Sequence, residues 1–143
     1  SILNNLDERF APSGITSYHK KELDLTKALE PFLVDREFDG IILDAPCSGS
    51  GTWGRTPEMI SSFEPQKIEW FSSLQKKIAA NVSKWLKPGK PLIYITCSAF
   101  KKENEEVKDF ICNNLGFDCE RYEVLKGYEN AADTMFVARL IKK

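Results

Sequence analysis

The chain has 143 residues, of which 42% are hydrophobic, so it can form one packed core and is too short for two ordinary domains. Charged residues make up 29% and the formal net charge is -1, which excludes a uniformly cationic protein that would coat any nucleic acid. The longest apolar runs are far shorter than the ~20 residues that cross a bilayer, and no signal-like segment opens the chain. We therefore expect a cytoplasmic protein without a membrane partner.

The cysteine content excludes a zinc site of ordinary spacing. Cys47, Cys97, Cys112 and Cys119 form no C-x-x-C pair, and His19 is the only histidine. We expect no metal. Two disulfides are the alternative state of four cysteines, but the Lys- and Glu-rich composition favours reduced thiols in a chain of this size.

The N-terminal part of the sequence predicts one helix and one weak strand. Apolar residues recur at helical spacing until a Pro-Ser-Gly breaker at 12–14, namely Ile2, Leu3, Leu6 and Phe10. Tyr18–Leu25 is read as a strand, although only Leu23 and Leu25 are apolar near its end. Asp24 would then lie at the C-terminal end of this strand.

A buried strand and a glycine-rich loop follow. Phe38–Asp44 is a short apolar run closed by an acid, as expected of a strand covered on both faces of a parallel sheet. The loop Pro46–Arg55 has three glycines and no periodicity, so its backbone can approach a ligand closely.

The next three elements alternate between helix and strand. Residues 65–86 carry apolar side chains every three or four positions, which predicts a long helix that ends at Lys87-Pro88-Gly89. Leu92–Thr96 is a second buried strand, and Cys97 occupies its C-terminal end. A helix over about Glu103–Leu115, acidic in its first turn, is stopped by Gly116.

Two further strands complete the predicted fold. Phe117–Leu125 and Thr134–Ile141 alternate in hydrophobicity and are expected to pair antiparallel. The order of elements specifies an α/β fold with a mostly parallel sheet and an antiparallel last strand, whose active residues lie at the C-terminal strand ends. The residues expected at this edge are Asp24, Asp44, Cys47 and Cys97.

Cys47 and Cys97 follow successive strands, so they are candidates for one shared site. Adjacent strands lie ~4.8 Å apart, and residues at their ends can be neighbours in space. The alternative is that both are small buried hydrophobic residues, which is the usual fate of a free cysteine. Strand-end loops carry function more often than strand interiors do.

The two cysteine segments resemble a known family. Asp44-Ala45-Pro46-Cys47-Ser48-Gly49 is similar to the signature of the Sun-type RNA cytosine-C5 methyltransferases, and Thr96-Cys97-Ser98 resembles their second cysteine motif. The similarity to this family spans essentially the whole chain. Further segments that resemble it are Arg55-x-Pro57, Gln75, Leu86-Lys87-Pro88-Gly89 and Glu103-Asn104-Glu105.

This resemblance implies an S-adenosylmethionine-dependent enzyme that methylates C5 of a cytosine in rRNA or tRNA. Cytosine C5 becomes nucleophilic only after addition at C6, and a thiolate can add there and later leave. By resemblance Cys97 is the nucleophile and Cys47 helps to release the product. Asp44 would hydrogen-bond the base at its amino group and N3, unless it only caps the following loop.

The resemblance also implies binding residues. Asp24, Asp44 and Pro46 would contact S-adenosylmethionine, although Asp24 could equally be a surface acid. Trp53 and Arg55 could stack on or clamp an RNA base. The alternatives are that Trp53 packs over the long helix and that Arg55 pairs with an acid.

One part of the expected fold has no counterpart in the sequence. A partial Rossmann-like methyltransferase fold needs a glycine-rich turn after its first strand, and none precedes Asp24. Residues 1–143 are therefore expected to form the C-terminal part of one catalytic domain, with N-terminal strands missing and little activity alone. A non-catalytic RNA- or protein-binding domain is the alternative function, and a thiol-disulfide protein is disfavoured because no C-x-x-C motif is present.

Overall fold

The computed structural model describes residues 2–33 and 36–143 and consists of a four-stranded sheet with helices packed on one face. The elements in chain order are α1 (Ile2–Phe10), β1 (Ile41–Asp44), α2 (Glu58–Ser61), α3 (Gln66–Val82), β2 (Pro91–Thr96), α4 (Glu105–Leu115), β3 (Phe117–Leu125) and β4 (Met135–Lys142). Short 3-10 turns lie at Ser50–Thr52, Ser83–Trp85 and Gly127–Asn130. In the part of the chain that the structure describes, no helix is long and apolar enough to cross a membrane.

The sheet has the strand order β1-β2-β4-β3. β1 and β2 pair in parallel, while β4 is antiparallel to both of its neighbours, β2 and β3. Three strands therefore run in one direction and the last strand is inserted between two of them in the opposite direction. The predicted α/β fold, mostly parallel with an antiparallel last strand, is confirmed.

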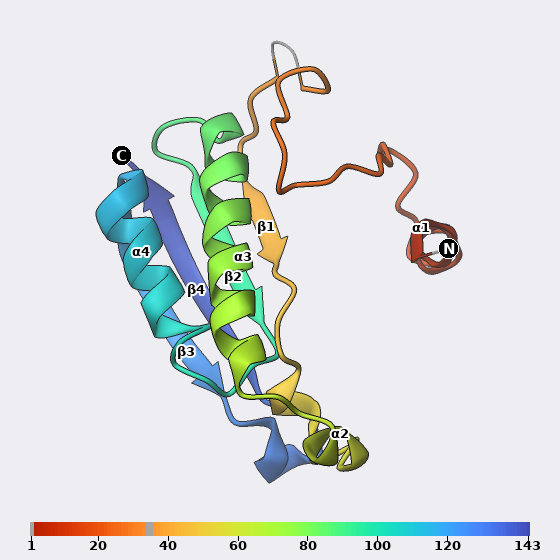
Figure 1. Cartoon of the computed structure of the whole chain (residues 1–143). Coiled ribbons are helices and arrows are strands. Elements are labelled where there is room, and N and C mark those ends of the chain that lie inside the picture. The colour runs from red at the N-terminus through yellow and green to blue at the C-terminus, as the bar shows by residue number, and fades with distance from the viewer. Residues whose placement is uncertain (1, 34–35) are drawn as a thin grey trace.

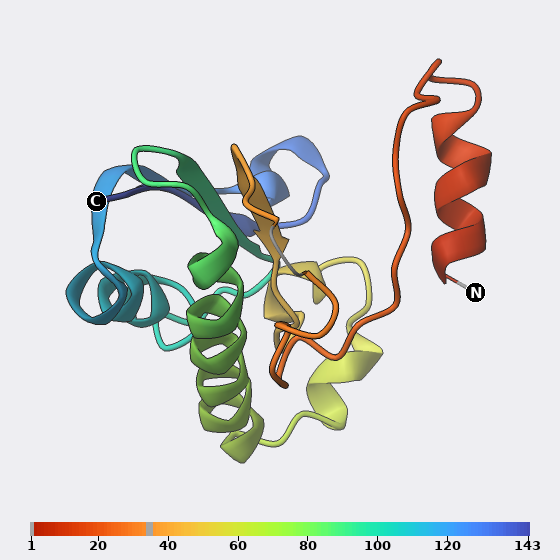
Figure 2. The same cartoon turned by 90° about the horizontal axis from the view of Figure 1, so that it is seen from above.

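Helices α3 and α4 lie side by side against the same face of the sheet (Figure 1, Figure 2). Every second residue of β2 points into this layer, which buries Leu92 and Tyr94 completely. These side chains pack with Ile78 of α3 and Ile111 of α4 in the core. The period of two in the strands and of three to four in the helices thus forms one apolar layer between sheet and helices.

The predicted boundaries hold within a few residues for the strongly periodic segments. The first helix, the two buried strands, the long helix, the fourth helix and the last two strands are all present. Gly116 ends α4 with a φ of 76°, a left-handed conformation that favours glycine. The short helix α2 was not predicted, because its four residues are too few to show a period.

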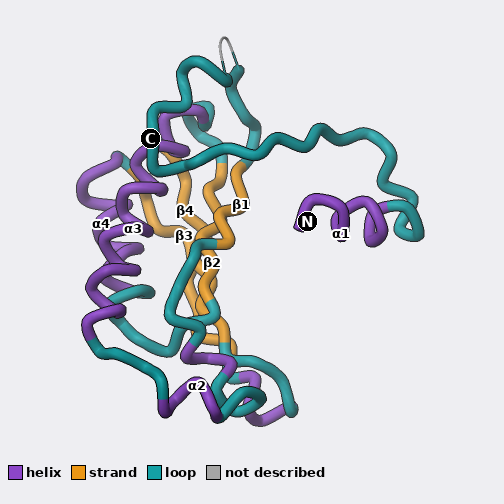
Figure 3. The backbone as a smooth tube through the Cα atoms, turned by 45° about the vertical axis from the view of Figure 1, so that its right-hand side comes forward, coloured by secondary structure: helices purple, strands orange, loops and turns teal. Residues whose placement is uncertain are grey.

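The predicted strand over Tyr18–Leu25 is wrong. Residues 15–24 have no regular secondary structure, and α1 with the segment after it lies apart from the sheet (Figure 3). Leu23 and Leu25 instead line an apolar pocket of about 310 Å³ together with Gly40 and Ile41 at the start of β1. The backbone between these two leucines pairs with no strand.

Candidate active site with two thiols

Cys47 and Cys97 form one site, as predicted, because their sulfur atoms lie 3.2 Å apart. The parallel pairing of β1 and β2 continues one residue beyond the strand, since the Ala45 N–H donates to the Ile95 carbonyl at 2.9 Å. Beyond this point β1 and β2 are each followed by a loop that carries one cysteine. Both cysteines are free and partly exposed, so a ligand can reach them.

The hydrogen bond between the two thiols makes them chemically unequal. With Cys47 as donor, the pKa of Cys97 is lowered to about 7. The pKa of Cys47 is raised well above its usual range, because its proton is held by the Cys97 sulfur and because the group is more buried. A substantial fraction of Cys97 is therefore thiolate at neutral pH, which is the nucleophilic form.

Asp44 is exposed at the end of β1 and close enough to the thiols to affect them. It is paired in register with Ile95, and its negative charge opposes the lowering of the Cys97 pKa. Among the described residues no hydrogen bond joins the Asp44 carboxylate to the following loop, so nothing supports the alternative that it is a loop cap. Pro46 is exposed beside it, and its carbonyl accepts a hydrogen bond from Gln75 Nε2 at 2.9 Å.

Asp24 does not lie with the other predicted site residues. Its neighbours Leu23 and Leu25 line the pocket at the start of β1, whereas the thiols follow the end of β1. The Asp24 carboxylate accepts hydrogen bonds from the backbone N–H and hydroxyl of Thr26 and pairs with Lys27. The contacts with Thr26 lower the pKa of the Asp24 carboxyl group. The same contacts close a local turn at the surface. The expected convergence of Asp24 with the cysteines is wrong because the strand that would carry it does not form.

Trp53 packs in an aromatic cluster. Its ring contacts Phe63 and Phe100 edge to face, with centroids 4.9 and 5.9 Å away. Phe63 and Phe100 stack on each other at 5.6 Å. The buried indole N–H has no hydrogen-bond partner among the described residues. The cluster joins the first cysteine loop to the segment after Cys97.

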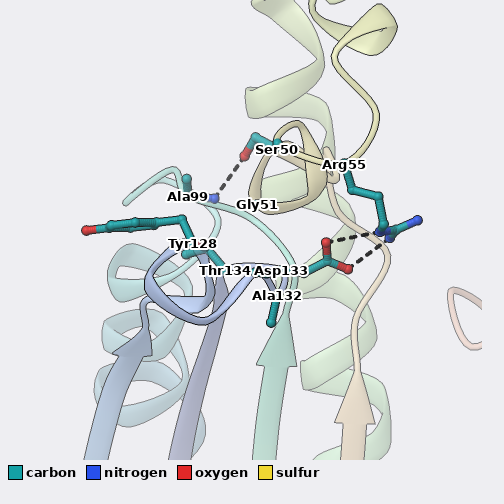
Figure 4. Close-up of a pocket in the computed structure, with 10 residues that line it drawn as sticks. Ser50, Gly51, Arg55, Ala99, Tyr128, Ala132, Asp133 and Thr134 are labelled. Carbon is teal, nitrogen blue, oxygen red and sulfur yellow. Dashed lines mark hydrogen bonds and ion pairs between the residues drawn. The ribbon is translucent and has the colours of Figure 1, made fainter.

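Arg55 forms an ion pair with an acid, which is the alternative interpretation of the sequence. Its guanidinium donates two hydrogen bonds to Asp133, at 3.2 and 2.8 Å (Figure 4). This contact lowers the pKa of Asp133 and raises that of Arg55. The partner could not be identified from sequence because 78 residues separate the two positions.

A pocket of about 810 Å³ lies beside the thiol loops (Figure 4). Three segments line this pocket: the first cysteine loop, the residue Ala99 after the second cysteine, and the segment before β4. The lining residues are Ser50, Gly51, Gly54, Arg55, Ala99, Tyr128, Ala131, Ala132, Asp133 and Thr134. The segment before β4 reaches this place because β4 runs antiparallel to β2, so the start of β4 lies at the C-terminal end of β2. The antiparallel insertion therefore completes the site.

Gly51 fixes the first loop against two other segments. Its N–H donates to the Cys97 carbonyl at 2.8 Å, and its carbonyl accepts from the Thr134 N–H at 2.9 Å. A Cβ atom at this position would lie 2.0 Å from the Thr134 carbonyl oxygen and 2.8 Å from that of Cys97. Only glycine allows this close approach of three backbone segments.

A family model described as 16S rRNA methyltransferase RsmB/F matches residues 3–141 of the chain. Ribosomal RNA small subunit methyltransferase F of Shewanella amazonensis is 38% identical over 95 residues, and tRNA (cytosine(49)-C(5))-methyltransferase of Pyrococcus abyssi is 34% identical over 90 residues. These matches cover 66% and 63% of this chain but only 20% and 29% of the relatives. The chain therefore spans about a fifth to a third of the length of these relatives.

A solved structure has the same fold. The crystal structure of NSun6 from Pyrococcus horikoshii with SFG superimposes with a TM-score of 0.83 at 23% sequence identity. The match covers 98% of this chain and 38% of that structure. The sheet and its two covering helices thus occur as part of a larger α/β protein.

Proposed function

Because the chain belongs to the 16S rRNA methyltransferase RsmB/F family, we propose that it carries the two catalytic cysteines of an RNA cytosine-C5 methyltransferase. The observation that supports this most directly is the 3.2 Å separation of the Cys47 and Cys97 sulfur atoms. The substrate class is rRNA or tRNA, since relatives with either substrate in their names match the chain.

Cys97 acts as the nucleophile in this proposal. Its sulfur adds to C6 of the cytosine, and the electrons of the C5–C6 double bond make C5 nucleophilic. The lowered pKa of Cys97, about 7, supplies the thiolate without a separate general base. Asp44, exposed at the end of β1, hydrogen-bonds the base at its amino group and N3 and stabilises the adduct.

Cys47 helps the product to leave. In the release step the C5 proton passes to water and the electrons of the C5–H bond restore the C5–C6 double bond. The bond between C6 and the Cys97 sulfur breaks, and its electron pair returns to the sulfur. The hydrogen bond that Cys47 donates stabilises the departing Cys97 thiolate, as it stabilises the free thiolate before attack. The same contact therefore favours both the first and the last step.

S-Adenosylmethionine, when bound, supplies the methyl group. Asp44 and Pro46 fit a contact with it, because both are exposed at the end of β1 beside the thiols. Asp24 is half exposed, so a contact with the cofactor forms beside those that its carboxylate already makes with Thr26 and Lys27. The NSun6 structure determined with SFG is consistent with a ligand site in this fold.

Trp53 and Arg55 contact the RNA in this proposal. Arg55 lies at the rim of the 810 Å³ pocket with most of its side chain exposed, so a phosphate or base can compete with Asp133 for the guanidinium. Trp53 braces the loop through its aromatic neighbours, and its partly exposed ring can stack on a base.

Covalent trapping in the enzyme that contains this chain tests the proposal. Cys97→Ala abolishes methylation and the covalent RNA adduct, because no thiolate remains to add to C6. Cys47→Ala retains attack but slows release, so a protein–RNA complex survives denaturing electrophoresis. Cys112→Ala serves as the control, since this half-buried cysteine of α4 lies outside the site. Normal methylation without an adduct in both site variants would refute the two-thiol mechanism.

A further inference from the structure

We propose that Glu103 is a positioning residue that holds the two cysteine loops at the separation the thiols need. An effect of Glu103 on catalysis rests on the proposed function, whereas its effect on the distance between the two thiols does not. Glu103 is completely buried, with an exposed fraction of 0%. Burial of a carboxyl group costs free energy unless hydrogen bonds compensate the loss of water. The hydrogen-bond partners of Glu103 therefore indicate its structural role.

The carboxyl group of Glu103 bridges the two loops, with one oxygen toward each. Oε2 accepts a hydrogen bond from the backbone N–H of Ser48 at 2.8 Å, directly after Cys47. Oε1 accepts a hydrogen bond from the hydroxyl of Ser98 at 2.8 Å, directly after Cys97. A change in the position of this carboxyl group therefore moves both cysteines relative to each other.

Gln75 of α3 ties the bridge to the other side of Cys47. Its Nε2 donates to Glu103 Oε2 at 3.1 Å and to the Pro46 carbonyl at 2.9 Å. Cys47 is thus held through the residue before it and the residue after it. The hydroxyls of Ser48 and Ser98 are 3.2 Å apart and strengthen the link between the loops.

The bridge is also anchored through the backbone of Glu103 and through its neighbour Asn104. The buried hydroxyl of Tyr94 in β2 donates to the Glu103 carbonyl at 2.6 Å. The neighbouring Asn104 accepts from the Thr96 hydroxyl at 2.6 Å and donates to the Ser98 carbonyl at 2.8 Å. Because these groups belong to the core, the Glu103 carboxyl has a fixed place from which to position the loops.

Glu103 does not act on the substrate itself. Donors occupy both of its oxygens, and it is shielded from solvent. Its effect passes through the hydrogen bond between the thiols. A displacement of one cysteine by about 1 Å breaks this bond, and misplacement of reacting groups by that distance can lower the rate about 100-fold. The measurable consequence is the pH at which Cys97 becomes reactive.

The test compares Glu103→Ala with the isosteric Glu103→Gln. The amide oxygen of glutamine can accept from Ser48 and Gln75, and its NH2 can donate to the Ser98 oxygen, whose hydrogen then turns to another hydroxyl. We expect Glu103→Gln to keep the midpoint of Cys97 alkylation near the pKa of about 7. Glu103→Ala raises this midpoint by about one pH unit, so alkylation at pH 7 slows roughly fivefold. Glu106→Ala is the matched control, because Glu106 is exposed and its carboxylate pairs with Lys102 on the surface.

Phenylarsine oxide provides a second measurement, because it binds two neighbouring thiols together. The original chain and Glu103→Gln bind it with both Cys47 and Cys97, whereas Glu103→Ala binds at least tenfold more weakly. Ser98→Ala keeps the test decisive if Glu103→Ala does not fold. It leaves Glu103 in place, removes the hydroxyl that donates to Oε1 and also contacts Ser48, Ser50 and the Phe100 N–H, and shifts the alkylation midpoint in the same direction.

Neither thiol measurement needs RNA or cofactor, so the outcome is independent of whether the protein methylates RNA. A folded Glu103→Ala with an unchanged alkylation profile and arsenical affinity overturns the positioning role. Where methylation is measurable, the variant lowers kcat and leaves KM for RNA unchanged. A change in KM alone would also overturn the inference, since it would place Glu103 in RNA binding.

Discussion

The sulfur atoms of Cys47 and Cys97 lie 3.2 Å apart although 50 residues separate them in the sequence. One thiol donates a hydrogen bond to the other, which lowers the pKa of Cys97 and raises that of Cys47. At neutral pH the pair therefore consists of one reactive thiolate, Cys97, and one protonated thiol, Cys47.

Removal of the Cys47 thiol should shift the reactivity of Cys97 to higher pH. Thiolate, the reactive form, increases as the pH rises through the pKa of Cys97, which is about 7 with the Cys47 hydrogen bond in place. Cys47→Ala removes the donor that lowers this pKa, so the midpoint of iodoacetamide alkylation moves upward. Peptide mass spectrometry separates Cys97 from the other cysteines, and Cys119→Ala serves as control because Cys119 lies on the exposed strand β3. An unchanged midpoint in Cys47→Ala would show that the thiols are not hydrogen-bonded in solution.

Gly51→Ala should destabilise the protein and disrupt the thiol site. The new Cβ would lie 2.0 Å from the Thr134 carbonyl oxygen, so backbone segments must move apart. Overpacking of this kind costs about 1–3 kcal/mol or more, measured here as a lower midpoint of urea unfolding. Gly54→Ala is the matched control in the same loop, because its Cβ would meet no atom within 4 Å. Equal stability of the two variants would contradict the close packing at Gly51.

Arg55→Gln should weaken RNA binding, whereas Asp133→Asn should not. The first change removes a cation that can contact phosphate, and the second frees that cation from its ion pair. If Arg55 contacts one phosphate, Arg55→Gln reduces the slope of log affinity against log salt by roughly one. Fluorescence anisotropy with a cytosine-containing RNA at several salt concentrations measures both quantities. Weaker binding in Asp133→Asn than in Arg55→Gln would assign the contact to Asp133.

The chain by itself should bind S-adenosylmethionine weakly or not at all. No glycine-rich turn follows a strand before β1, and the Asp24 carboxylate is engaged with Thr26 and Lys27. Asp44 and Pro46 remain as contacts, too few for micromolar affinity, which requires ~8 kcal/mol. Isothermal titration calorimetry measures the affinity directly. Micromolar binding would show that the 143 residues form a complete pocket.

Local sequence patterns determined most of the elements and the identity of the thiol site. Apolar periodicity predicted α3, α4, β3 and β4, and short continuous apolar runs predicted β1 and β2. The weak pattern at Tyr18–Leu25 gave a wrong strand, since its two apolar residues near the end line an apolar pocket without any strand. The cysteine motifs predicted a shared site because parallel strands end at the same edge.

Only the tertiary structure decided what surrounds the thiols. Asp133 reaches Arg55 because β4 is inserted antiparallel between β2 and β3, a pairing that no local pattern specifies. Glu103 follows the second cysteine motif in sequence, but its carboxyl contacts both loops only because β1 and β2 lie side by side. The sequence by itself thus determined most of the elements and predicted which residues form the thiol site. The long-range packing of the sheet determined the hydrogen bonds that position those residues and set the pKa of Cys97.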